Sequence, residues 1–174
     1  LRYGQAQFYK HEYFEAIETF KFIESEYKKE DSRFAASMWL AKTYLQLTQL
    51  QEAEDKLDYL RNQPNLPKDL KGEYEAASAD FYLQTKSYDK AIEHLTKASI
   101  FAKKRADRIR FMFILAQLHQ QHGDYKKAFD MYTRVIKKNP EEEMAFHSRI
   151  NRARCFDAQS QNSHKVKDEL NKML

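Results

Sequence analysis

The chain has 174 residues, of which 42% are hydrophobic and 32% are charged, and its formal net charge is +4. This composition is too apolar for a disordered protein, and no run approaches the roughly 20 uninterrupted apolar residues of a membrane-spanning helix. A single Cys excludes an internal disulfide. The chain has only three Gly and three Pro, and because these residues interrupt helices, their scarcity predicts an all-α protein.

A short motif recurs along the chain, as EYFEAIETF, QLQEAEDKL, SYDKAIEHL and GDYKKAFDMY. Each copy contains an anchor Ala, and the four anchors are Ala16, Ala53, Ala91 and Ala128, spaced by 37 or 38 residues. Large apolar residues stand three positions before and four positions after each anchor, which is the spacing of one helix face. The sequence therefore predicts a repeated helix around each anchor.

A second helix is expected upstream of the anchor helix in each unit. Twelve positions before the anchors are the small residues Gly4, Ala41, Ala79 and Ala116, and small residues let two helix backbones approach closely. A fifth unit continues with Ala153, and its second helix carries Val166, Leu170 and Met173. The predicted helix pairs occupy residues 1–29, 31–62, 67–101, 105–138 and 140–174. They form one array over 1–174, with a longer loop at 62–69.

The stretch HGDYKKAFDMYTRVIKKNP, residues 122–140, predicts how helices end and begin. Gly123 and Asp124 are expected to turn the chain between the two helices of one unit. Asn139 is expected to cap the next helix, with Pro140 at its first position and three Glu, 141–143, in its positive first turn. We therefore assign the acidic triplet to helix-start electrostatics rather than to a metal or partner site.

The segments YGQAQFYKHEYFEAIETF (3–20) and LAQLHQQHGDYKKAFDMY (115–132), followed by Pro140, resemble the tetratricopeptide repeat. The resemblance covers nearly the whole chain and implies a right-handed α-solenoid of about five antiparallel helix pairs. It also implies a non-catalytic scaffold that binds a protein or peptide partner on its concave face. The period is longer than the family's usual ~34 residues, so the pitch of the superhelix cannot be copied from the family.

A narrower resemblance concerns RYGQAQFYKHEYFEAIETF, AKTYLQLTQLQEAEDKLDYL and KNPEEEMAFHSRINRA. These segments are similar to tetratricopeptide proteins of Bacteroidetes, in particular the outer-membrane-associated lipoprotein of the gliding and type IX secretion machinery. This implies a periplasmic scaffold in a cell-envelope assembly, whereas a cytoplasmic location is the alternative without it. Because the chain does not begin with Met and starts within a predicted helix, we expect a fragment of a longer protein.

A partner is expected on the inner wall of the superhelix, which the first helix of each pair lines. Helical offsets place the following residues on this wall: Gln5, Tyr9, Met38, Lys42, Leu45, Gln46, Asp80, Leu83, Gln84, Phe113, Gln117, Gln121 and Arg154. They would offer polar contacts and apolar anchors to an extended or helical peptide. Solvated surface is the alternative for the amides Gln46, Gln84 and Gln121, because Gln is a good helix former anywhere.

No group of residues points to catalysis or to a cofactor. His119 and His122 have a ligand-like spacing but no third ligand nearby in the sequence. Cys155 occupies a packing position without an adjacent base. The sequence therefore predicts neither an enzyme nor a metal, a cofactor or a small-molecule substrate.

The basic run KKRADRIR at 103–110 places five cations near one helix start, where they oppose the helix dipole. It predicts an alternative function, the binding of nucleic acid or an anionic surface, and its own alternative is a solvated or internally paired surface. Self-association through exposed terminal repeats is a further expectation.

Overall fold

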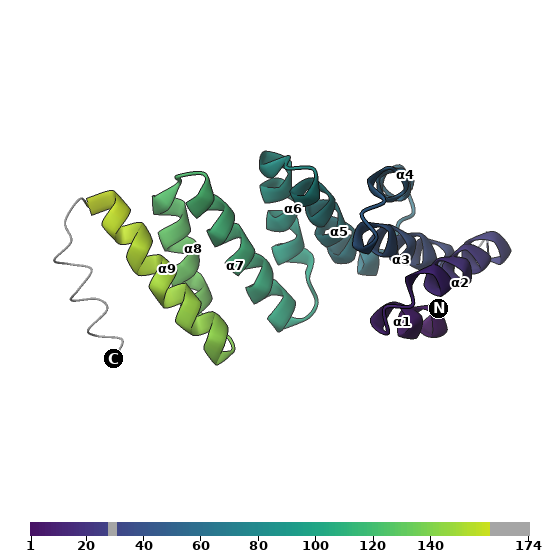
Figure 1. The fold of residues 1–174 in the computed structure, drawn as a ribbon, viewed down its shortest axis with the longest axis horizontal. Helices are drawn as coiled ribbons and strands as arrows, with labels where there is room; N and C mark the ends of the chain where they lie inside the picture. The colour runs from purple at the N-terminus through teal and green to yellow at the C-terminus, as the bar shows by residue number, and fades with distance from the viewer. Residues whose placement is uncertain (28–30, 161–174) are drawn as a thin grey trace. The chain divides into compact units, whose positions relative to one another are not determined.

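The structure is a computed structural model that describes residues 1–27 and 31–160, without the side chains of residues 157–160. Every regular element in this range is helical (Figure 1). The elements are α1 (Arg2–Tyr9), α2 (Tyr13–Glu26), α3 (Ser32–Gln46), α4 (Leu50–Arg61), the short 3₁₀ helix η1 (Lys68–Leu70), α5 (Lys71–Gln84), α6 (Tyr88–Phe101), α7 (Arg105–Gln121), α8 (Tyr125–Lys137) and α9 (Glu142–Ser160). This confirms the all-α prediction.

The helices form antiparallel pairs whose bounds follow the predicted units. The pairs are α1 with α2, α3 with α4, α5 with α6, and α7 with α8, and α9 opens the fifth unit. The second helix predicted for that unit, with Val166, Leu170 and Met173, lies outside the described residues. Among the described residues, none of the helices combines the length and hydrophobicity that a membrane crossing requires.

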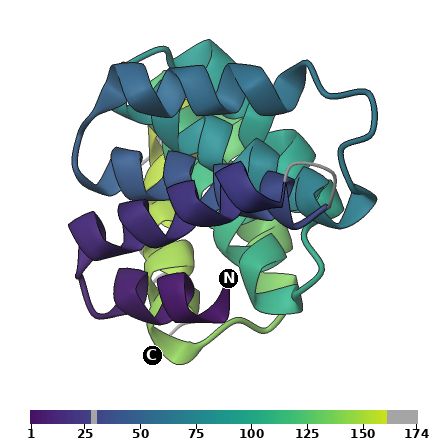
Figure 2. The ribbon, with the colours of Figure 1, turned by 90° about the vertical axis from the view of Figure 1, so that its right-hand side faces the viewer.

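The chain divides into two compact units, Leu1–His94 (unit 1) and Leu95–Leu174 (unit 2), with the boundary inside α6. In unit 1, α2 packs against α1 and α3, and α3 packs against α4 and α5. Figure 2 looks onto this N-terminal part, with α1 and α2 in purple. In unit 2, α8 packs between α7 and α9. The single array over 1–174 stays a prediction.

The small residues of the repeat lie at helix contacts, as expected. The four anchor Ala residues and Ala41, Ala79 and Ala116 are completely buried. At Gly4 the Phe20 ring packs directly on the backbone of α1, because a Cβ there would lie 2.6 Å from Cε1 of Phe20. The lack of a side chain at Gly4 therefore makes room for Phe20 between α1 and α2.

The turns between paired helices share one backbone conformation. His11, Thr48, Lys86 and Gly123 each lie five residues before an anchor Ala, and each has a positive φ, between 55° and 77°. The next residue donates its amide to the carbonyl five residues earlier, at 2.8–2.9 Å, which is the Schellman hydrogen bond. The predicted turn at Gly123 is confirmed, and the other three helix pairs form the same turn without glycine.

Asn139 differs from its predicted role as the cap of the next helix. Its φ is +47° and its amide donates to the Ile136 carbonyl at 3.0 Å, so it terminates α8. Asn tolerates the left-handed conformation better than most residues. The next helix, α9, begins at Glu142, so Glu142 and Glu143 occupy its first turn as predicted, whereas Pro140 and Glu141 precede the helix.

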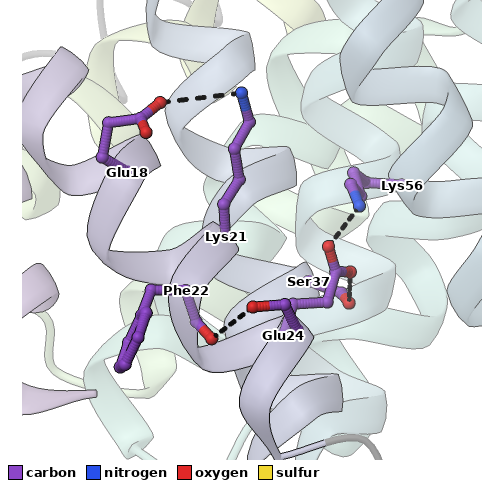
Figure 3. Close-up of polar contacts among 7 residues, drawn as sticks. Glu18, Lys21, Phe22, Glu24, Ser37 and Lys56 are labelled. Carbon is purple, nitrogen blue, oxygen red and sulfur yellow. Dashed lines mark hydrogen bonds and ion pairs between the residues drawn. The ribbon is translucent and has the colours of Figure 1, made fainter.

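A polar cluster joins three helices of unit 1 (Figure 3). The Glu24 carboxylate on α2 accepts a hydrogen bond of 2.5 Å from the Ser37 hydroxyl on α3. It also lies 2.6 Å from the Lys56 ammonium on α4. Ser37 is completely buried, so this partly buried carboxylate fixes the positions of α2, α3 and α4 relative to one another.

Candidate partner-binding surface

The exposed Tyr9 and the half-buried Trp39 form an aromatic ledge on α1 and α3 of unit 1. Tyr9, at the end of α1, is 71% exposed and makes an edge contact with Trp39 on α3, with ring centroids 5.8 Å apart. The other side of Trp39 packs against Phe8 at 5.2 Å and stacks on Phe20 at 6.0 Å. Trp39 thus packs between α1, α2 and α3 and also supports an exposed tyrosine.

Lys42 continues this ledge along α3 and connects it to α5. Its ammonium lies 4.5 Å from the centroid of the Trp39 ring and forms an ion pair with Glu73 on α5. The cation–π contact and the ion pair hold the long Lys42 side chain in one place. Its orientation is therefore set before any partner arrives.

The amide side chain of Gln84 is also held in place. Its Nε2 donates to Asp80 Oδ1 at 3.2 Å and to the Leu45 carbonyl at 3.4 Å. Both contacts are made by the NH₂ group, which leaves the amide oxygen of Gln84 to accept a hydrogen bond from a ligand. Gln46 is exposed, and Leu83 and Gln5 are half-buried.

Met38 and Leu45 differ from their expected place on the binding wall. They are 0% and 2% exposed and belong to the core of unit 1. Met38 lies three residues before the buried Ala41 and Leu45 lies four residues after it, so all three share one helix face. We therefore remove both residues from the candidate surface.

The remaining predicted wall residues lie in unit 2. Gln117 and Gln121 on α7 and Arg154 on α9 are exposed. Phe113 is half-buried and packs edge-on against Tyr132, with ring centroids 5.9 Å apart. Phe113 therefore contributes mainly to the core of unit 2 rather than to an open wall.

The sequence prediction left out Glu73, which the structure places beside Lys42. Glu73 lies seven residues, or two helical turns, before the predicted wall residue Asp80. Extending the helical offset by two more turns would have identified it. The partner that it chooses, Lys42, is 31 residues away, and no local pattern indicates that pairing.

The residues that could have carried chemistry are held in packing environments. Cys155 is completely buried, and burial raises the pKa of its thiol to about 11. Burial, together with the nearby Lys127, lowers the pKa of His119, whose Nδ1 lies 3.6 Å from Asp124. Over the residues that the structure describes, no group of three or more His, Cys, Asp or Glu side chains could hold a metal ion.

Comparison with known proteins gives a family match for part of the chain. Residues 74–140 match the family model described as tetratricopeptide repeat. A search of curated proteins found no match.

Several solved structures resemble the chain over almost its whole length. The TPR-like repeats of a putative kinesin light chain from Podosopora anserina are 20% identical, with a TM-score of 0.70, covering 98% of this chain and 89% of that chain. A signal transduction ATPase with a tetratricopeptide repeat sensor from Pyrococcus horikoshii is 16% identical, with a TM-score of 0.79, covering 97% of this chain and 28% of that chain. MamA is 15% identical, with a TM-score of 0.69, covering 97% of this chain and 85% of that chain.

At these identities the likeness shows the fold. Proteins with this fold are generally protein–protein interaction scaffolds. The chain therefore has the tetratricopeptide-like, all-α repeat fold that its sequence predicted.

Proposed function

We propose that the chain is a non-catalytic scaffold that binds a peptide segment of a protein partner. The binding surface lies on α1, α3 and α5, the first helix of each pair in unit 1. The observation that carries this proposal is the ledge of Tyr9, Trp39 and Lys42. Tyrosine and tryptophan are enriched among the residues that contribute most of the binding energy at protein interfaces, and Lys42 adds a fixed charge beside them.

The ledge favours a peptide with an aromatic or aliphatic anchor. Tyr9 and Trp39 present ring edges from two helices, so an apolar side chain can pack against both. Because Phe8 contacts both rings and Phe20 stacks on Trp39, little side-chain entropy is lost when a ligand binds. Preorganisation of this kind favours binding at a modest interface area.

The polar residues beyond the ledge favour an extended backbone as the ligand. The Gln84 amide oxygen and the Asp80 carboxylate accept hydrogen bonds, and the peptide N–H groups of an extended segment would supply them. Exposed Gln46 lies one turn after Lys42 on the same helix. A peptide running from α1 across α3 to α5 would meet the anchor first and these polar groups second.

Peptide selection with defined variants tests this proposal. A displayed random peptide library is selected on the immobilised chain, and each selected peptide is titrated against wild type while the emission of Trp39, the only tryptophan, is recorded. We expect Tyr9→Ala to weaken binding by about tenfold or more, as for a hot-spot tyrosine. Lys42→Ala is expected to weaken it by a smaller factor.

Tyr3→Ala is the matched control, because Tyr3 lies on the same helix and is also 71% exposed. It should leave affinity and the Trp39 response unchanged. Selected peptides that bind Tyr9→Ala as tightly as wild type, or a library that yields no binder, would contradict the proposal.

The cell-envelope setting is proposed from the sequence resemblance alone. In that setting the ledge would hold a segment of another envelope component. Fractionation of the source cells, with the chain detected by an antibody, distinguishes a periplasmic from a cytoplasmic location.

A further inference from the structure

The two units carry opposite net charge. Unit 1 has 13 Lys and Arg against 17 Asp and Glu, which gives −4, whereas unit 2 has 17 against 9, which gives +8. The mild overall charge of +4 therefore conceals a strong separation of charge along the chain. Charge separation of this size steers association between oppositely charged surfaces.

A hollow of about 310 Å³ in unit 2 concentrates the positive charge. Arg105, Arg108 and Lys138 surround it, and Ile100, Ile109 and Met112 supply its apolar lining. We call it the basic hollow. All of its charged lining residues are cations. Of its apolar lining, Ile100 is 68% exposed, Met112 is half-buried and Ile109 is buried.

The cations of the basic hollow are positioned but not neutralised. The Arg105 guanidinium donates a hydrogen bond to the Lys138 carbonyl, which ties the start of α7 to the end of α8. No acidic group among the described residues forms an ion pair with Arg108 or with the Lys138 ammonium. A ligand for this hollow should therefore combine carboxylates with apolar side chains.

Unit 1 carries such a surface on α2. Phe14, Glu18, Phe22 and Glu26 follow one another at intervals of four residues, which places them along one side of the helix. Phe14 and Phe22 are 68% and 61% exposed. Glu18 pairs with Lys21 at 3.7 Å, and both side chains are well exposed (Figure 3). We call these four residues the acidic stripe.

The repeat itself does not explain the exposed phenylalanine Phe14. Phe14 lies two residues before its anchor Ala, and the equivalent residues in the later units are Gln51, Asp89 and Lys126. All three are polar and exposed although other helices precede them in the chain. An additional helix pair ahead of α1 would therefore not be expected to bury Phe14, and its apolar side chain needs another reason.

We propose that the acidic stripe of one copy docks in the basic hollow of a second copy. Phe14 and Phe22 would cover the apolar lining, while Glu18 and Glu26 would pair with Arg108 and Lys138. Because the two surfaces are different, the contact is head-to-tail and leaves one stripe and one hollow free on each dimer. Association therefore continues beyond two copies and weakens as salt screens the ion pairs.

The first measurement is the mass of the whole 174-residue chain by sedimentation velocity over a range of concentrations. At low salt the average mass should rise with concentration past that of a dimer, and high salt should return it to the monomer. A mass that stays monomeric at every concentration, or that is unaffected by salt, would overturn the proposal.

Two variants identify the surfaces. Phe14→Ser with Glu18→Gln disables the stripe, and Arg108→Ala with Lys138→Ala disables the hollow. The first variant removes one apolar contact and one charge, and the second removes two charges. Each double variant should therefore associate about tenfold more weakly or worse. When the two are mixed, the intact hollow of one and the intact stripe of the other should form a one-to-one dimer that grows no further.

Matched controls separate this contact from general effects of charge and hydrophobicity. Lys126→Ala with Arg149→Ala removes two exposed cations of unit 2 elsewhere, and Phe146→Ser removes another exposed phenylalanine. Both controls should associate like wild type. Failure of the mixed variants to form the dimer while each keeps its helical circular dichroism would refute the pairing of these surfaces.

A filter-binding assay with a single-stranded oligonucleotide tests the competing ligand class. Salt-sensitive retention by wild type that the hollow variant loses, in a chain that does not self-associate, would assign the basic hollow to nucleic acid instead.

Discussion

Unit 1 and unit 2 follow the same repeat but present different surfaces. Both bury an anchor Ala and a small residue at each helix contact, and both turn through the same Schellman hydrogen bond. Unit 1 adds a partly buried carboxylate cluster and an exposed aromatic ledge, whereas unit 2 adds an open hollow surrounded by cations. The repeat thus sets the backbone spacing, while residues outside its pattern are free to diverge in charge and chemistry.

Truncation of Tyr132 should have the largest effect and tests whether the two units unfold separately. Tyr132 is completely buried, and its hydroxyl donates to Gln120 Oε1 at 2.8 Å. Tyr132→Ala should lower the free energy of unfolding by about 3–5 kcal/mol. We expect the midpoint of urea denaturation to shift more when unfolding is followed by circular dichroism than when it is followed by Trp39 fluorescence. The reason is that Tyr132 lies in unit 2 and Trp39 lies in unit 1.

Equal shifts of both probes would show that the units unfold as one cooperative body. Lys126→Ala is the control, because Lys126 is exposed in the first turn of α8, and it should shift neither probe by more than about 0.5 kcal/mol.

Glu24→Gln tests the polar cluster that distinguishes unit 1. The substitution removes the charge that pairs with Lys56 and leaves a weaker acceptor for Ser37. We expect a loss of about 1.5–3 kcal/mol in the free energy of unfolding, the range for hydrogen bonds to a charged group. Trp39 fluorescence during urea denaturation reports it.

Glu18→Gln is the matched control. It makes the same substitution on the same helix, but the Glu18–Lys21 pair is exposed. It should cost less than about 0.5 kcal/mol. If both substitutions cost the same, the partly buried cluster has no special role in unit 1.

Substitutions at the positive-φ position test the turn that unit 1 and unit 2 share. No atom would lie within 4 Å of a Cβ at Gly123, where φ is +77°, so Gly123→Ala should cost about 1 kcal/mol through backbone conformation alone. Thr48, a β-branched residue with φ of +55°, should gain about 0.5–1 kcal/mol on Thr48→Gly. Thermal denaturation of both variants measures the two signs, and a gain for Gly123→Ala would contradict the strain argument.

The smallest expected effect is a pH dependence in unit 2. Burial lowers the pKa of His119 below its ordinary value of 6.5, so the unfolded chain binds more protons than the folded protein below that pH. The stability contributed by neutral His119 is therefore present above pH 6.5 and is lost as the pH falls through the lower folded pKa.

Urea denaturation followed by circular dichroism on either side of pH 6.5 should show this loss, and His119→Gln should reduce it. Asp124, which faces His119, has a pKa lowered mainly by its hydrogen bond to Lys127, and its contribution is lost only below its ordinary value of 3.8. An unchanged pH slope in His119→Gln would exclude His119 as the source.

The helix pairs and their contacts could be predicted because their signals are local. The spacing of Ala41 from Ala53 and of Ala116 from Ala128 specifies two helices and the side on which each is small. The turns were predicted only at Gly123, because His11, Thr48 and Lys86 adopt the same positive φ without a glycine to signal it. There the hydrogen bonds of the turn outweigh the conformational preference of the residue.

The sequence by itself determined the repeat, the helix pairs and the buried small residues, since each follows from the periodicity of neighbouring residues. Only the tertiary structure decided that Lys42 meets Glu73 and that Lys138 joins Arg105 and Arg108 around one hollow. These outcomes depend on which helices approach each other and how closely. Residues about thirty positions apart leave no periodic signal of the contact that they will make.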